Sequence, residues 1–234
     1  MNLRAIKPLH ETQTRILDAA EELFMQHGFE GASMRMLTAR AGVNLAAINY
    51  HFGSKDALVE AVFRRRLDPE NAERIAELDR LEKASGGAPL APATIIRAFV
   101  GTSLRMIQDE KKGGRNFIRL LGRTYTDPAK RIRALIGQLY APAMARFKDA
   151  FAKALPELPR EELVWRLHFM FGTLSYTLAA TDTLELIAGC KPEDRYDAAV
   201  LESRLTAFLA AGLLAPVPQR TGQRATDESV KQAA

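Results

Sequence analysis

Residues 33–55 read SMRMLTARAGVNLAAINYHFGSK, and they predict two short helices joined by a tight turn. Ser33 and Asn44 are residue types that cap helix N-termini, so a helix is expected after each. Gly42 lies between the two helices and can adopt the left-handed backbone that ends the first one. Two helices with this spacing form a helix-turn-helix, whose second helix enters the major groove of DNA.

The face that the second helix is expected to expose suits a nucleic acid. If Ile48 points inward, helical spacing places Leu45, Ala46, Asn49 and Tyr50 outward. The quoted stretch contains no Asp or Glu, so its own side chains would not repel phosphate. The helix dipole and the free N–H groups at the start of this helix also favour phosphate.

The rest of the chain predicts an all-α fold. Ala, Leu, Arg, Glu and Met dominate the long segments, and no Asn-Gly or Asp-Gly hairpin signal is present. Pro69 is expected to break or kink the helix that begins at Lys55, and Pro142 is expected to kink a later one. Apolar spacing places helices at about 12–27, 33–41, 45–52, 55–67, 70–83, 93–108, 116–125, 128–155, 161–187 and 196–214.

These helices predict two domains between two irregular ends. We expect a flexible arm over 1–11 and a three-helix helix-turn-helix domain, with its linking helix, over 12–67. A larger helical domain is expected over 68–215. The polar end, 216–234, is expected to be disordered.

Composition limits the classes of function. The 234 residues are 47% hydrophobic and carry a formal charge of +5, with a sequence pI near 9.4, which makes a polyanionic partner plausible. No charged-then-apolar leader is seen, and no run of about 18 apolar residues, so we expect a cytoplasmic protein without a membrane partner.

An enzyme would need a constellation of reactive side chains that the sequence does not supply. The four histidines, His10, His27, His51 and His168, include no pair at i, i+4 spacing, and there is no cysteine cluster for zinc. Gly-rich phosphate loops and nucleophile elbows are also missing. We therefore predict no catalytic residue, metal or cofactor. Cys190 beside Lys191 leaves redox control open as an alternative.

Residues 41–58, AGVNLAAINYHFGSKDAL, resemble the stretch that defines tetracycline-repressor (TetR) type regulators. The resemblance covers about 12–67 and implies that Tyr50 and Lys55 bind phosphates, while the starts of the two short helices read bases and backbone. One departure is Thr38, where the family usually has Ala, so its hydroxyl would need a local backbone acceptor. The implied DNA-binding residues are Ser33, Met34, Arg35, Asn44, Leu45, Ala46, Asn49, Tyr50, His51 and Lys55.

Two later stretches, 116–122 and 165–172, resemble the C-terminal domain of the PsrA-like branch of this family. That branch responds to fatty acids or related acyl compounds, so the resemblance implies a long, largely apolar pocket for a hydrophobic small-molecule inducer. Apolar residues at this spacing would also fit a simple core. The candidate lining residues are Phe99, Ser103, Met106, Phe117, Arg119, Leu121, Arg123, Tyr125, Phe147, Trp165, Arg166, His168, Phe169 and Tyr176, with Arg119, Arg123, Arg166 and His168 as possible polar anchors.

The last two long helices contain small residues that permit close helix approach, among them Gly172, Ala207, Ala211 and Gly212. In TetR-type proteins the corresponding pair forms a four-helix bundle with its two-fold mate. A single helix-turn-helix also makes too few contacts for tight binding. We thus expect a homodimeric, ligand-responsive transcriptional regulator, a repressor released from double-stranded operator DNA by its inducer. A regulator that responds to a protein partner instead of a ligand stays open.

Overall fold

The computed structural model describes residues 3–109, 114–126, 130–178, 183–189 and 197–218. Within these residues every regular element is a helix, which confirms the predicted all-α class. The helices are α1 (Leu3–Gly31), α2 (Met34–Ala41), α3 (Leu45–Phe52), α4 (Lys55–Ala84), α5 (Pro92–Gln108), α6 (Gly114–Thr126), α7 (Lys130–Ala154), α8 (Arg160–Leu178), α9 (Thr183–Ala188) and α10 (Ala198–Leu214).

The two short helices have the predicted caps. Ser33 accepts a hydrogen bond from the Met36 N–H at 3.2 Å, and Asn44 accepts one from the Ala47 N–H at 2.8 Å. Gly42 ends α2 in the left-handed region with φ 64°. Capping therefore fixes both ends of the turn, and with them the direction in which α3 leaves it.

The first helix starts earlier than the sequence predicts. The expected arm over 1–11 is instead largely helical, because α1 is described from Leu3. Pro8 lies inside this helix and does not end it. Gly28 interrupts α1 with φ 73° and ψ 174°, at the position where the sequence predicts its end.

The fourth helix runs unbroken through Pro69, so the predicted interruption there is not seen. Contacts on both sides of the proline hold the helix in line. On one side Arg65 pairs with Asp18 of α1 at 2.6 Å. On the other, the buried Asn71 side chain donates to the Leu139 carbonyl of α7 at 2.9 Å. Tertiary contacts thus override the local cost of proline, and the predicted domain boundary between 67 and 68 falls inside one helix.

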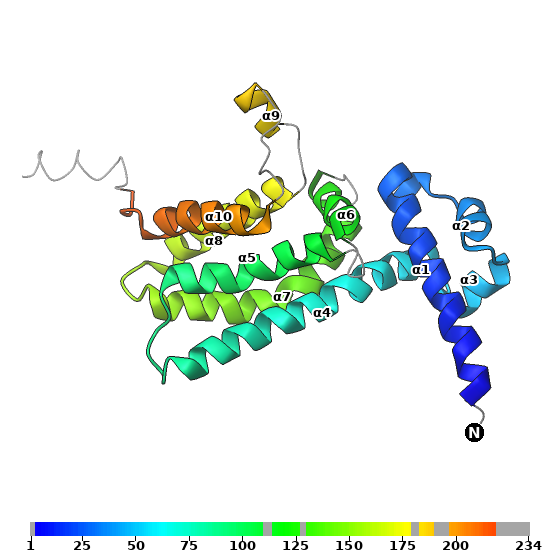
Figure 1. The fold of residues 1–234 in the computed structure, drawn as a ribbon, viewed down its shortest axis with the longest axis horizontal. Helices are drawn as coiled ribbons and strands as arrows, with labels where there is room; N and C mark the ends of the chain where they lie inside the picture. The colour runs from blue at the N-terminus through cyan, green and yellow to red at the C-terminus, as the bar shows by residue number, and fades with distance from the viewer. Residues whose placement is uncertain (1–2, 110–113, 127–129, 179–182, 190–196, 219–234) are drawn as a thin grey trace, which may run out of the picture.

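The N-terminal unit of α1, α2, α3 and the start of α4 lies at one end of the molecule, with α6 beside α1 (Figure 1). Its hydrophobic core does not stop at this unit, because Phe117 and Ile118 of α6 belong to the same buried cluster. Phe63 of α4 contacts Phe29 of α1 and Phe117 of α6, with ring centroids 5.7 and 5.9 Å apart. One core therefore spans the predicted domain boundary.

A second core fills the other end, where α5, α7, α8 and α10 pack around the end of α4. Phe99 of α5 lies at its centre, with edge-to-face contacts to Phe147 and Phe171 at 5.0 and 5.2 Å. The predicted helix over 161–187 is described as two, α8 and α9, and residues 179–182 lie outside the described part. Among the described helices, none is long and apolar enough to cross a membrane.

Candidate nucleic-acid interface and ligand cavity

Helix α3 has one buried side and one side exposed to solvent, as the spacing of its residues predicts. Ile48 is fully buried, while Leu45 is 49% exposed and Tyr50 is 75% exposed. Ala46 and Asn49 are exposed on the same helix. The exposed side of α3 therefore carries aliphatic, amide and phenol groups and no carboxylate.

The turn between α2 and α3 is held by a residue that sequence analysis missed. Arg15 of α1 donates from Nη2 to the carbonyl oxygens of Ala41 and Gly42, at 2.6 and 2.8 Å. A Cβ atom at Gly42 would lie 2.9 Å from that nitrogen, so both the left-handed backbone and the space favour glycine here. Arg15 carries no motif signal of its own, since it lies a whole helix away from the turn.

The other predicted DNA contacts differ in how they are held. Arg35 is exposed, whereas Met34 is half-buried and packs against the core, so it offers less surface than the sequence suggests. His51 is half-buried and meets the Tyr50 ring edge-on at 5.3 Å. Lys55 opens α4 and donates to the Glu30 carbonyl at 3.3 Å, which leaves two of its three N–H groups for other acceptors.

Two acidic side chains near this surface are paired with arginines. Glu22 pairs with Arg40 at 2.5 Å, and Asp56 pairs with Arg131. The Thr38 hydroxyl donates to the Arg35 carbonyl at 2.9 Å, which is the local backbone acceptor that the sequence required. The surface of α2 and α3 thus keeps the electrostatic character expected of a phosphate-binding face.

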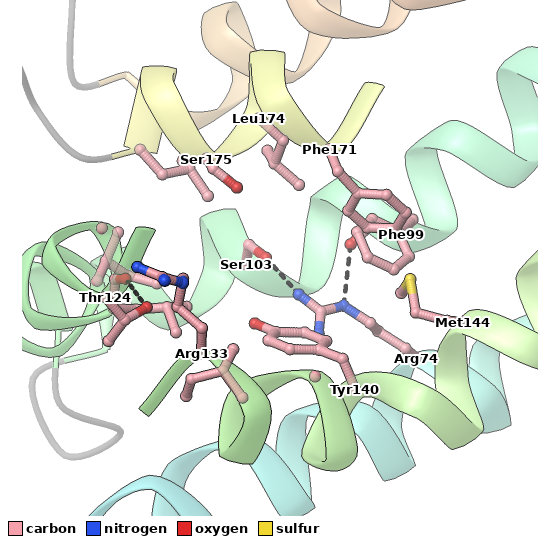
Figure 2. A pocket seen from close by; sticks show the side chains of 16 residues that line it. Arg74, Phe99, Ser103, Thr124, Arg133, Tyr140, Met144, Phe171, Leu174 and Ser175 are labelled. Atoms are coloured by element: carbon pink, nitrogen blue, oxygen red, sulfur yellow. Dashed lines mark hydrogen bonds between the residues drawn. The ribbon is translucent and has the colours of Figure 1, made fainter. Parts of the chain in front are cut away.

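A cavity of about 300 Å³ lies between α4, α5, α6, α7 and α8. Its wall is mostly apolar, with a few hydroxyl and guanidinium groups (Figure 2). It is lined by Arg74, Phe99, Ser103, Ile118, Leu121, Gly122, Thr124, Arg133, Ile136, Gly137, Tyr140, Met144, Phe171, Leu174, Ser175 and Leu178. A concave apolar site with few polar groups is the usual form of a small-molecule site.

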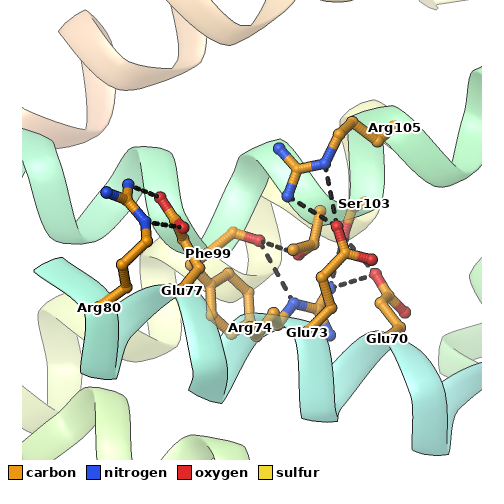
Figure 3. A network of polar contacts seen from close by, with 9 residues as sticks. Glu70, Glu73, Arg74, Glu77, Arg80, Phe99, Ser103 and Arg105 are labelled. Atoms are coloured by element: carbon orange, nitrogen blue, oxygen red, sulfur yellow. Dashed lines mark hydrogen bonds and ion pairs between the residues drawn. The ribbon is translucent and has the colours of Figure 1, made fainter.

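The polar floor of the cavity is a buried ion pair. Arg74 is 1% exposed and donates to Glu70 and to Ser103, both at 2.5 Å, while its guanidinium lies over the Phe99 ring at 4.5 Å. Ser103 also donates to Glu70 at 2.9 Å. Figure 3 shows this network between α4 and α5. The charge of Arg74 is therefore neutralised from behind the cavity wall.

Exposed pairs surround the network on the same helices. Arg105 binds Glu73 at 2.9 Å, and Arg80 binds Glu77 through two hydrogen bonds (Figure 3). The hydrogen bonds from Arg80 lower the pKa of the Glu77 carboxyl. Both pairs face solvent and neither lines the cavity; the first joins α5 to α4, and the second lies within α4.

Three of the predicted ligand residues, Phe99, Ser103 and Leu121, line this cavity. Met106, Phe117 and Phe147 are buried in the hydrophobic cores and do not line the cavity. The side chains of Arg119, Arg123 and Tyr125 lie outside the described part of the structure.

The predicted ligand residues on α8 point away from the cavity. Trp165, His168, Phe169 and Tyr176 lie on the exposed side of the helix, because the phase of α8 turns Leu167, Met170 and Leu174 inward. Arg166 is buried, but it binds Glu162 at 2.8 Å and the Leu213 carbonyl at 2.7 Å, so it joins α8 to α10 instead of reaching a ligand.

The cavity contains residues that the sequence analysis did not select. Arg74, Tyr140, Met144, Phe171 and Ser175 all line it. The i, i+4 spacing of Glu70 and Arg74 was visible, but the same spacing is usual for a pair exposed to solvent. Only the packing of five helices shows that this pair is buried.

Among the described residues, no group of three or more His, Cys, Asp or Glu side chains could hold a metal ion.

Comparison with known proteins shows the family to which the chain belongs. Residues 16–62 match the family described as bacterial regulatory proteins, tetR family, and residues 97–212 match the tetracyclin repressor-like C-terminal domain. The chain belongs to the TetR family.

Individual relatives of this TetR-family chain are similar over limited parts or at low identity. The transcriptional repressor AcnR of Corynebacterium efficiens is 41% identical over 71 residues, which are 30% of this chain and only 35% of AcnR. The fatty acid degradation regulator FadR of Bacillus halodurans has a TM-score of 0.59 at 17% identity, covering 88% of this chain and 97% of FadR. FadR of Bacillus subtilis, solved with stearoyl-CoA, has a TM-score of 0.60 at 14% identity, covering 85% and 98%. At these identities the two structures establish a shared fold.

Proposed function

We propose that the protein is a homodimeric transcriptional repressor that binds double-stranded operator DNA and leaves it when a hydrophobic small molecule fills the cavity. The observation that carries this proposal is the bare, acid-free face of α3, capped by Asn44 and presented at one end of the molecule. The match of residues 16–62 to the tetR family supports the same conclusion.

Two kinds of DNA contact follow from the positions of the side chains. Tyr50 and Lys55 flank the C-terminal end of α3 and the start of α4, where they bind phosphates. Leu45, Ala46 and Asn49 lie on the exposed side of α3, where they reach base edges. Phosphate contacts set affinity, and base contacts set sequence preference.

Dimerisation is proposed through the outer faces of α8 and α10. Large apolar side chains are exposed on both helices: Trp165, Phe169, Tyr176, Phe208 and Leu214. Gly172, Ala211 and Gly212 are exposed among them and let a second pair of helices approach closely. An apolar surface of this kind marks a protein interface, and a two-fold axis would present two DNA-binding units to one operator.

We propose that a ligand in the cavity acts on the DNA-binding unit through α6. Ile118 and Leu121 of α6 line it, and their neighbour Phe117 packs against Phe63 in the N-terminal core. The stearoyl-CoA bound to the B. subtilis FadR supports an acyl class of inducer for a chain of this fold, as does the resemblance to the PsrA-like branch.

The proposal is tested by operator binding across salt concentrations. Tyr50→Phe and Lys55→Ala are expected to weaken binding to all DNA sequences, and Lys55→Ala to reduce the slope of log affinity against log salt by about one, because each phosphate contact by a cation releases counterions. Fluorescence anisotropy with a labelled operator and with random DNA measures both effects.

Substitution at Asn49 gives the matched comparison. Asn49→Ala is expected to change the preference among operator variants by roughly tenfold while leaving the salt slope unchanged. Wild-type affinity and slope in Lys55→Ala would contradict the assignment of the phosphate contact. An unchanged sequence preference in Asn49→Ala would contradict base reading by α3.

A further inference from the structure

Glu70 lies between two arginines of α4 at equal spacing, with Arg66 one turn before it and Arg74 one turn after it. Side chains four residues apart on a helix are within reach of each other. In the structure Glu70 pairs with Arg74, whereas Arg66 pairs with Glu21 of α1 at 3.1 Å. The carboxylate therefore has a second arginine within reach, and that arginine is tied to the N-terminal unit.

The carboxylate of Glu70 is bound through one of its two oxygens. Its Oε1 accepts hydrogen bonds from Arg74 at 2.5 Å and from Ser103 at 2.9 Å (Figure 3). In the described part of the chain, its Oε2 is buried without a hydrogen-bond partner, and so is Nε of Arg65. Glu70, Arg65 and Arg66 all line a second cavity of about 200 Å³ between α4 and α5. The unpartnered oxygen and the unpartnered donor thus belong to residues of one cavity.

The two arginines of this second cavity hold α1. Arg65 pairs with Asp18 at 2.6 Å and also with Glu21. Arg66 binds Glu21 as well, through two hydrogen bonds of 3.1 and 3.4 Å. Arg15, on the same helix α1, holds the turn between α2 and α3. A change in the ties between α1 and α4 therefore changes how the turn before α3 is held.

Both donors that hold Glu70 also line the ligand cavity. Arg74 and Ser103 form part of its wall, so an oxygen acceptor on a ligand can bind them in place of the Glu70 carboxylate. The Glu70 side chain is only 3% exposed. A buried carboxylate that loses its cation is strongly destabilised until it pairs with another.

We propose that Glu70 is a switch with two partners, Arg74 when the protein binds DNA and Arg66 when a ligand acceptor occupies Arg74. In the second arrangement Glu70 competes with Glu21 for Arg66, so α1 is held less firmly against α4. This inference rests on the proposed function for its role in induction. It assigns the ligand one chemical feature, an oxygen acceptor that reaches Arg74.

Arg74→Met imitates the ligand, because it takes the partner away from Glu70 without adding a molecule. Operator binding by this full-length variant is expected to weaken roughly tenfold in fluorescence anisotropy. The double variant, Glu70→Met with Arg74→Met, also removes the competing carboxylate, so its operator affinity should return to the wild-type value. Equal weakening in the single and the double variant would overturn the switch.

Leu78→Ala controls for a simple loss of stability. Leu78 is fully buried on the same helix and belongs to the second core, so its truncation destabilises the protein without releasing a carboxylate. Measured well below its melting temperature, Leu78→Ala should bind operator DNA as the wild type does. Arg80→Met, which opens an exposed pair on α4, should do the same. Weakening in Leu78→Ala equal to that in Arg74→Met would show that stability alone is responsible.

A crystal structure of Arg74→Met tests the exchange directly. It is expected to show the Glu70 carboxylate on Arg66, and a carboxylate still turned toward position 74 would overturn the proposal. If Arg74→Met does not fold, Arg74→Lys keeps a buried charge pair but holds the carboxylate through fewer directed hydrogen bonds. Its operator binding should weaken in the same direction by a smaller factor, and wild-type affinity would count against the switch.

The outcomes separate this inference from the proposed function. If the wild type binds operator DNA and Arg74→Met binds it equally well, the switch fails and the regulatory role stands. If the wild type does not bind operator DNA, the regulatory role fails, while the position of Glu70 in the variant crystal structure still decides the exchange.

Discussion

Asn44 connects the stability of a short helix with its use. Its side chain accepts the Ala47 N–H at 2.8 Å and caps an eight-residue helix that has little stability of its own. Asn44→Ala is expected to lower the free energy of unfolding by about 1 kcal/mol and to weaken operator binding, because the first turn of α3 frays. Urea denaturation and anisotropy measure the two effects on one preparation.

Asn44→Asp separates the cap from the contact. Aspartate caps as well as asparagine, so the free energy of unfolding should stay within a few tenths of a kcal/mol of the wild-type value. Its carboxylate would stand on the face that meets phosphates, so operator affinity should fall at least tenfold. If Asn44→Asp bound DNA as well as the wild type, this end of α3 would not approach the duplex.

Single residues also show which local features the sequence predicts and which it does not. The caps at Ser33 and Asn44 and the turn at Gly42 depend on local chemistry, and the structure confirms them. The role of Arg15 is visible only in the tertiary structure, because its hydrogen-bond partners are 26 and 27 residues away in the chain. No pattern in the sequence singles it out from other exposed arginines.

At the scale of elements, α4 is the helix that local reasoning describes least well. Proline predicted an interruption, but ties to α1 on one side and to α7 on the other keep the helix continuous. For α8 the difficulty is different, because both of its sides carry large apolar residues. Periodicity alone cannot tell which side meets the core, so Trp165 and Phe169 were assigned to a pocket that they do not line.

The buried pair on α4 makes a second prediction. Arg74→Met leaves Glu70 charged and buried with its main partner removed, so the free energy of unfolding is expected to fall by about 3–5 kcal/mol. Replacing both residues, Glu70→Met with Arg74→Met, should recover much of that loss, because no charge is then left without a partner. Chemical denaturation of the two variants measures the difference.

The exposed pair about two turns further along the same helix, Glu77 with Arg80, is the control. Arg80→Met breaks a hydrogen-bonded pair with Glu77 that faces solvent, so its effect should stay below about 1 kcal/mol. A double variant no more stable than Arg74→Met would show that the network stabilises the helices through shape and not through charge balance.

At the scale of the whole molecule, the exposed face of α8 and α10 predicts the oligomeric state. Phe169 is 61% exposed in the single chain, and Phe169→Glu would place a charge in the proposed two-fold interface. We expect this variant to be monomeric by light scattering and to bind operator DNA at least a hundredfold more weakly, because one DNA-binding unit then acts alone.

Ala152→Glu places the same charge at an exposed position of α7 and should leave the dimer intact. A Phe169→Glu protein that stays dimeric would move the interface elsewhere on the molecule.

The order of the helices and their class could be read from the sequence, because helical spacing and caps are local signals. The packing of the N-terminal unit against α6 of the larger domain could not be predicted from the sequence. Phe63 and Phe117 are 54 positions apart in the chain, yet they share one core, and apolar spacing says only that each is buried somewhere.

That shared core limits how the molecule can be taken apart. Phe117 of α6 is fully buried in the core of the N-terminal unit, so this unit cannot be exchanged between proteins without α6. A chimera that grafts residues 12–67 onto a foreign effector domain would have to import an aromatic residue in the place of Phe117. Without that aromatic residue, the chimera would have an unfilled cavity in its core next to Phe63.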